Sequence, residues 1–350
     1  MDSERSDRPS NPARRRALAG LGGVALAPWC RAGPVEVVDG AGRHVARDGP
    51  VRTVFPAGGP AAILLYTLAP DLLAGWPRAN RAEERPFLLP GIGDRPEVGR
   101  LTGRGGTANL EAVLALKPDL ILDSGSTRGT YVDLADRVQR QTGIPYALFD
   151  GRLERIPETY RTLGRLIGRE ARAETLAAWA GRALATVRER LAGVESRPRV
   201  YYARGPRGLE TGLAGSINVE AFDFLGLTHF GMRMPGGLAN VPLEEVLWWN
   251  PEVIITIDRD FAASVRHDPV WAGVAAVRDG RVHLSPKLPF GWVDFPPGVN
   301  RLPGLFWLGQ KVHPERFPDD LAALTREFYA LFYQVEPDDA QVADVLEGRG

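Results

Sequence analysis

The sequence lacks the residue patterns on which several classes of function depend. It holds one cysteine, Cys30, so no disulfide can form within the chain. Lysine plus arginine and aspartate plus glutamate both number 43, so we expect no broad basic face for nucleic acid. The GxSxG elbow, the P-loop and the HExxH motif are all missing, which argues against an enzyme. No metal-binding spacing such as HxxxH occurs among the five histidines, His44, His229, His267, His283 and His313.

Residues 1–34 have the composition of an export signal. Three arginines at 14–16 precede an apolar run from Ala17 to Trp29, which is shorter than the about 20 residues of a membrane span. The arginines and the weakly apolar, Gly-rich run favour the twin-arginine route, with the Sec route as the alternative, and hence a periplasmic protein. The residues before Cys30 do not favour a lipid anchor. A basic tail on a cytoplasmic protein is the competing interpretation.

Two stretches of the chain have nearly the same sequence. LEAVLALKPDLIL at 110–122 matches LEEVLWWNPEVII at 243–255 in its leucines, glutamate, valine, proline and isoleucine. Each stretch has apolar residues at helical spacing, then a proline that ends the helix, then a continuous apolar run typical of a buried parallel strand. The repeat predicts two copies of a helix–turn–strand unit.

Strand and helix patterns alternate on both sides of the two copies. RTVF at 52–55, IPYALFD at 144–150, RVYYA at 199–203 and RVHLSP at 281–286 read as strands. A chain of 350 residues has room for about two domains. We therefore expect an α/β fold of two Rossmann-like lobes with mostly parallel central sheets, joined by one long α-helix. The predicted boundaries are an N-terminal lobe at 35–168, a connecting helix at 169–195 and a C-terminal lobe at 196–350.

The connecting segment REARAETLAAWAGRALATVRERLAGV, at 169–194, contains no proline and is rich in Ala, Leu, Glu and Arg. This composition predicts a helix from about Glu170 to Ala192, about 35 Å long. A helix of that length would limit how far two lobes can swing, because bending it breaks backbone hydrogen bonds.

Together, the export signal, the repeat and the long helix resemble the substrate-binding proteins of ABC importers. The most specific matching motifs are Asn109-Leu110-Glu111 with Lys117-Pro118-Asp119, and the segment GWVDFPPGVNRLPGLFWLG at 291–309. The likeness is greatest to the branch that carries ferric siderophores, haem and cobalamin, which has a cousin group that carries oxyanions such as molybdate. The resemblance covers nearly all of the chain after the export signal.

This resemblance implies two exposed glutamates that dock against arginines of the membrane permease. The motif assigns them to Glu111 and Glu244, one in each copy of the repeat. Carboxylate and guanidinium groups form charge-assisted hydrogen bonds, so the pairing is chemically sensible. The partner would be an ABC permease of the inner membrane, and nothing in the sequence requires more than a monomer.

The ligand of an open α/β sheet binds beyond the carboxyl ends of its strands, so the candidate contacts follow the predicted strands. Glycines there can bring backbone N–H groups close to a ligand, aromatic residues can pack on it, and arginines can pair with its carboxylates. The candidates are Gly58, Gly59, Trp76, Arg78, Arg81, Ser124, Ser126, Arg204, Arg207, Trp292 and Phe295.

The sequence leaves the transported solute open. A large anionic iron complex, a ferric siderophore or haem, suits the mixture of aromatic residues and arginines best, with cobalamin or an oxyanion such as molybdate as alternatives. No permanently bound cofactor, catalytic group or resident metal is expected. A bare divalent metal would need the histidines of the second half, and an axial haem ligand could come from Tyr66, Tyr201 or His283. An exported sensor or interaction module without a solute is the alternative from another class.

Overall fold

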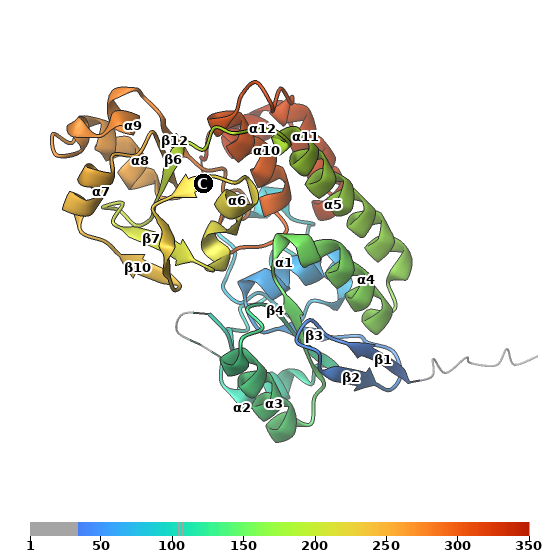
Figure 1. Ribbon diagram of the computed structural model, residues 1–350. Helices are drawn as coiled ribbons and strands as arrows, with labels where there is room; N and C mark the ends of the chain where they lie inside the picture. The colour runs from blue at the N-terminus through green and yellow to red at the C-terminus, as the bar shows by residue number, and fades with distance from the viewer. Residues whose placement is uncertain (1–33, 104–105, 107, 350) are drawn as a thin grey trace, which may run out of the picture. The chain divides into compact units, whose positions relative to one another are not determined.

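The computed structural model describes residues 34–103, 106 and 108–349 (Figure 1). The predicted export signal at 1–34, with Cys30, lies outside the described residues apart from Pro34. The described chain begins with an antiparallel hairpin that the sequence patterns did not predict, β1 (Val35–Val38) and β2 (His44–Arg47). Over the described ranges, none of the helices is both long and apolar enough to cross a membrane.

The N-terminal half contains a parallel sheet in the order β3-β4-β5. Ile121 in its central strand aligns with Phe55 on one side and Tyr146 on the other. The strands are β3 (Val54–Pro56), β4 (Leu120–Gly125) and β5 (Tyr146–Asp150). The helices of this half are α1 (Gly59–Leu68), α2 (Leu110–Leu116), α3 (Gly129–Thr142) and α4 (Ile156–Ile167). The predicted alternation of strands and helices is confirmed here.

The C-terminal half contains a second parallel sheet, in the order β12-β11-β6-β8. Its strands are β6 (Arg199–Ala203), β8 (Thr228–His229), β11 (Val253–Thr256) and β12 (Val282–Leu284). Its helices are α6 (Glu220–Phe224), α7 (Leu243–Trp249), α8 (Arg259–Ser264) and α9 (Ala275–Arg278). A small mixed sheet, not predicted, consists of β7 (Glu210–Ala214), β9 (Gly231–Pro235) and β10 (Leu238–Asn240).

The two copies of the repeat adopt the same local structure. Helices α2 and α7 each have seven residues and end at a left-handed residue, Lys117 or Asn250, with φ of 48° in both. After the following proline, Asp119 accepts hydrogen bonds from the backbone N–H groups that lead into β3, at 2.7 and 2.9 Å. Glu252 accepts the equivalent bond from the N–H of Arg199 at the start of β6, at 2.9 Å. The acidic residue of each copy therefore ties its strand to the neighbouring strand.

Alternate residues of the central strands face different hydrophobic clusters, as the period of two along a strand requires. Leu120 and Leu122 of β4 and Val200 and Tyr202 of β6 belong to one large core cluster. The residues between them belong to smaller clusters, such as the one in which Tyr201 packs with residues of α7 and α8. One face of each parallel sheet thus packs into the same large core, and the other face packs against a smaller cluster. The strands of both sheets are therefore buried on both faces.

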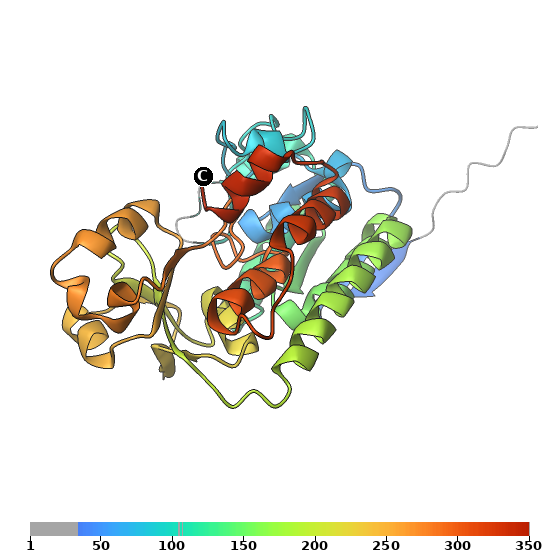
Figure 2. The ribbon, with the colours of Figure 1, turned by 90° about the horizontal axis from the view of Figure 1, so that it is seen from above.

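The long helix α5 (Glu170–Leu191) confirms the predicted connecting segment and spans about 33 Å. It packs against α4 and, in Figures 1 and 2, lies beside the red C-terminal helices. Trp179 donates a hydrogen bond to Glu327 at 2.6 Å, and its ring lies 5.3 Å from that of Phe332. The C-terminal helices are α10 (Arg301–Val312), α11 (Leu321–Phe328), a π-helical turn (Tyr329–Tyr333) and α12 (Asp339–Leu346). Residues 301–333 follow the C-terminal sheet in the sequence but share the large core cluster with α1 of the N-terminal half and with α5. The core therefore does not divide at residues 168 and 196, and these two lobe boundaries stay predictions.

Candidate solute-binding site

Cationic side chains follow two adjacent strands of the C-terminal sheet. Arg259 comes three residues after β11, and Lys287 comes three residues after β12. These strands are parallel neighbours, so their carboxyl ends lie at one edge of the sheet. That edge is where the ligands of open α/β sheets bind.

Charged groups from both halves of the chain surround Lys287. Its ammonium lies 5.8 Å from the centre of the Phe295 ring, within the range of a cation–π contact. Burial lowers the pKa of Lys287, the positive charges of Arg81 and Arg259 lower it further, and the carboxylates of Asp258 and Glu84 act in the opposite direction. We call Arg81, Arg259, Lys287 and Phe295 the cationic site.

Arg81 is held in the cationic site by a buried carboxylate. Glu84, whose side chain is fully buried, accepts hydrogen bonds from Arg78 at 2.7 and 2.8 Å and from Arg81 at 2.9 Å. Burial alone would raise the pKa of Glu84, but these hydrogen bonds outweigh it and the pKa lies below its usual range. One buried carboxylate thus positions two half-exposed guanidinium groups.

Phe295 is held in place by a buried network of polar contacts centred on Asp294. Oxygens of the Asp294 carboxylate accept hydrogen bonds from Tyr202 at 2.8 Å, from Asn218 at 2.7 Å and from the backbone N–H of Phe295 at 2.6 Å. Phe295 has a φ of 69°, a left-handed conformation that is strained for an aromatic residue. Its ring is nevertheless 54% exposed. A strained backbone that presents an exposed ring beside an ammonium group is typical of a functional site.

Arg204 belongs to the same buried network of polar contacts and does not face the solvent. Its guanidinium is buried and lies 3.3 Å from Glu210 and 3.4 Å from Asp294. Two carboxylates thus already face the charge of Arg204, and its contact with a ligand stays a prediction. Arg207, in the turn that follows β6, is exposed, and no described residue pairs with it.

The two tryptophans expected to contact ligand are core residues. Trp76 is 2% exposed; its indole N–H donates to the carbonyl of Ile92 at 2.8 Å, and its ring lies 5.6 Å from those of Tyr66 and Phe290. Trp292 is completely buried. Long-range aromatic packing covers segments that local sequence marked as loops, and the ligand contacts of Trp76 and Trp292 stay predictions.

The glycines and serines after the N-terminal strands have mainly packing roles. A Cβ on Gly58 would lie 2.7 Å from the Thr102 hydroxyl, and one on Gly59 would lie 3.1 Å from the Pro296 ring. Ser124 lines a pocket whose space for water centres is about 20 Å³, enough for one or two waters. Ser126 accepts a hydrogen bond from the N–H of Arg128 at 3.3 Å. None of the four residues is brought to the cationic site by a described contact.

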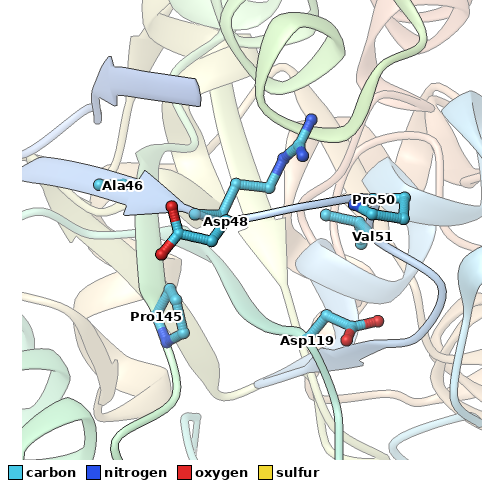
Figure 3. A pocket seen from close by; sticks show the side chains of 7 residues that line it. Ala46, Asp48, Pro50, Val51, Asp119 and Pro145 are labelled. Atoms are coloured by element: carbon cyan, nitrogen blue, oxygen red, sulfur yellow. The ribbon is translucent and has the colours of Figure 1, made fainter. Parts of the chain in front are cut away.

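A larger pocket of about 250 Å³ lies at the opposite ends of the N-terminal strands (Figure 3). Its lining includes Val51, Asp119 and Pro145, which precede β3, β4 and β5. The Asp119 carboxylate, seen at the lower edge in Figure 3, is already engaged by the backbone N–H groups of Arg52 and Thr53. Ligands of parallel sheets bind at the carboxyl ends, so this pocket is not the candidate site.

The candidates for an axial haem ligand have other contacts. The hydroxyl of Tyr66 donates to the carbonyl of Tyr333 at 2.9 Å, and that of Tyr201 donates to Gly208 at 2.8 Å. Burial raises the pKa of Tyr66 to about 12. Burial and nearby cations lower the pKa of His283 to about 4. In the described part of the chain, no three His, Cys, Asp or Glu side chains gather as a metal site would require.

Glu111 and Glu244 occupy equivalent and exposed positions. Each is the second residue of its helix, α2 or α7, and points to no partner among the described residues. A carboxylate in the first turn of a helix is favoured by the positive end of the helix dipole. Both side chains are therefore available to a partner protein.

The profile of the periplasmic binding protein family matches residues 69–288. The chain belongs to the periplasmic binding protein family. This match confirms the resemblance to the substrate-binding proteins of ABC importers, which are transport proteins and not enzymes.

Two similar proteins, one of them matched both by sequence and by structure, place this periplasmic binding protein among its relatives. The molybdate-binding protein MolA of Haemophilus influenzae is 31% identical over 169 residues, which is 47% of either chain, so the match spans about half of that relative's length. A solved ABC transporter solute-binding protein from Sulfurospirillum deleyianum is 27% identical, with 89% of this chain and 98% of that chain covered and a TM-score of 0.81. The structure of MolA bound to molybdate is 22% identical, covers 87% and 99%, and has a TM-score of 0.71. The predicted two-lobe α/β fold is confirmed.

The binding protein's cationic site was only partly predictable. Arg81 and Phe295 were among the predicted contacts, whereas Lys287, Arg259 and the supporting carboxylates Glu84 and Asp294 were missed. Lys287 and Arg259 could have been found by the rule that ligand contacts follow strand ends. Glu84 and Asp294 could not, because buried carboxylates at those positions have no local sequence signal.

Proposed function

We propose that this chain is the solute-binding protein of an ABC importer in the periplasm, and that it captures an anionic solute at the cationic site. The observation that carries the proposal is that Arg259 and Lys287 follow the carboxyl ends of β11 and β12, where the charge of Arg81 from the N-terminal half also acts on Lys287. Four cations, Arg78, Arg81, Arg259 and Lys287, face three carboxylates, Glu83, Glu84 and Asp258, which leaves one excess positive charge. An anion would relieve their mutual repulsion.

An oxyanion such as molybdate is the solute that we favour. The relative MolA is a molybdate-binding protein, which supports this choice, as does the presence of ammonium and guanidinium donors at the cationic site. Oxyanions accept charge-assisted hydrogen bonds from such donors in several directions. The solute is cargo, and no permanently bound cofactor is proposed.

An anionic iron complex, such as a ferric siderophore or haem, is the second candidate. It is favoured by one observation, the exposed ring of Phe295 beside Lys287. An aromatic face can pack against the organic part of a chelate, which a bare oxyanion does not offer. The predicted contacts Arg78 and Arg81 suit the carboxylates of either ligand.

Calorimetric titration of the mature protein tests the solute. The panel contains molybdate, sulfate, ferric siderophores, haemin and cobalamin. We expect saturable molybdate binding at micromolar or lower concentration, about −8 kcal/mol or stronger, and no comparable binding of sulfate. If one iron complex binds and molybdate does not, the second candidate replaces the first. If no member of the panel binds, solute capture as proposed is contradicted.

We further propose that Glu111 and Glu244 contact basic residues of the permease. Changing both to arginine should reduce solute uptake into proteoliposomes containing the importer by at least about tenfold, because two attractive charge pairs become repulsive. The measurement compares uptake with solute affinity in the same preparation. Solute affinity should not change, since no described contact links either residue to the cationic site.

Glu170 provides the matched control for the docking prediction. It is an exposed glutamate in the first turn of α5, like Glu111 in the first turn of α2. Glu170→Arg should leave uptake unchanged. Parallel losses of uptake and of solute affinity in the Glu111 and Glu244 variants would remove the docking role.

A further inference from the structure

Both copies of the repeat expose apolar side chains, Leu114 and Leu116 on α2 and Trp248 on α7, but only α7 exposes a tryptophan. Trp248 of α7 is 87% exposed, and the position that matches it in α2 is Ala115. On the same helix, Val246 is fully buried, and Leu247 and Trp249 pack partly against the core. Other apolar side chains of α7 therefore pack against the core, whereas Trp248 points toward the solvent.

Trp248 lies on the same helical face as Glu244. Residues four apart on a helix are surface neighbours about 5 to 6 Å apart at their Cβ atoms. Glu245, three residues before Trp248, adds a second carboxylate, and no described residue pairs with either glutamate. The face thus combines one exposed indole with two unpaired negative charges.

We infer that Trp248 is an apolar anchor of the permease-docking face, seated in an apolar pocket of the permease that is flanked by arginine or lysine. The inference rests on the proposed docking role of Glu244, because continuity with that residue and charge complementarity identify the occupant. Tryptophan is enriched among the residues that dominate protein–protein binding energy, and its side chain buries about 200 Å². Charge pairs at the rim steer the encounter, while a buried aromatic slows dissociation.

The salt dependence of importer binding distinguishes the contribution of the Trp248 indole from that of the carboxylates. Exposed charge pairs are screened when the Debye length shortens, whereas burial of apolar surface is not. Trp248→Ala should weaken binding to the importer, held in lipid nanodiscs, by at least about tenfold at both about 50 mM and about 500 mM salt. Glu244→Arg should weaken binding strongly at low salt and much less at high salt.

Val270→Ala is the matched control, because Val270 is also an exposed apolar residue, 52% exposed, but lies outside α2 and α7. It should bind the importer as the unchanged protein does, and molybdate affinity should be the same in all variants. Unchanged binding of Trp248→Ala beside a loss in Glu244→Arg would overturn the anchor and leave the proposed function standing. A concentration-dependent dimer that Trp248→Ala dissolves, with importer binding unchanged, would assign the indole to a second copy and also overturn the inference.

Discussion

Replacing Lys287 with methionine should weaken molybdate binding about a hundredfold, equivalent to about 2.7 kcal/mol. Methionine keeps the length and the apolar stem but removes the ammonium that lies 5.8 Å from the Phe295 ring. The remaining guanidinium groups of Arg81 and Arg259 would share the anion alone. Calorimetry on folded protein, checked by circular dichroism, gives the dissociation constant of each variant.

Lys311→Met is a closely matched control for Lys287→Met. The Lys311 ammonium also lies 5.8 Å from an aromatic ring, that of Trp307, but outside the cationic site. Its replacement should leave molybdate affinity unchanged. Equal losses in the two variants would show that general positive charge, and not the cationic site, attracts the anion.

The pH dependence gives the same prediction a second readout. Burial, with Arg81 and Arg259, lowers the pKa of Lys287 in the free protein, and a bound anion would raise it again. Molybdate affinity should therefore fall as pH rises through the free-state pKa of Lys287, and binding in that range should take up protons. In Lys287→Arg this decrease should vanish, because arginine stays charged.

Replacing Arg301 with alanine should lower the free energy of unfolding by about 3 to 5 kcal/mol. Arg301 is 1% exposed and contacts Glu220 at 2.6 Å, the carbonyl of Gly298 at 3.0 Å and the carbonyl of Gly151 in the N-terminal half. Glu220 also accepts the N–H of Leu153 at 2.9 Å, so the pair ties the two halves together. Without the arginine, a largely buried carboxylate would lose the guanidinium group that contacts it. Urea unfolding measures the loss.

The pH dependence of the Arg301→Ala defect follows from the Glu220 carboxyl. Burial raises its pKa even with Arg301 present, which acts in the opposite direction. Without Arg301 the folded-state pKa rises further, so the defect should be largest above that pKa and shrink as acid protonates Glu220. The double variant Arg301→Met with Glu220→Gln should recover much of the stability. A loss below 1 kcal/mol in Arg301→Ala would contradict the structural role of the pair.

The sequence was most informative where local pattern and tertiary structure agree. The strand RVYYA coincides with β6, and the proline-free segment after residue 169 coincides with α5. In both repeat copies a proline ends the helix and a buried run follows, so their structure could be predicted from spacing alone. The β1–β2 hairpin was missed although Val35-Glu36-Val37 alternates before an Asp39-Gly40 turn, whereas the strands of the small mixed sheet are too short for a clear pattern.

The site was less predictable because it depends on contacts between distant segments. Trp76 and Arg204 have the residue types of ligand contacts, yet the first packs between Tyr66 and Phe290 and the second lies against Asp294. Conversely, Lys287 looks like an ordinary loop lysine until the fold brings it near Arg81. Residue type and strand order narrow the choice, but side-chain direction is decided by packing.

The most direct test of anion capture at the cationic site is anomalous X-ray diffraction from crystals grown with molybdate, recorded near the molybdenum absorption edge. The proposal predicts one strong molybdenum peak within hydrogen-bonding distance of the Lys287 ammonium and the Arg81 guanidinium. A peak at the pocket lined by Asp119, or no ordered molybdenum in saturated crystals, would contradict it.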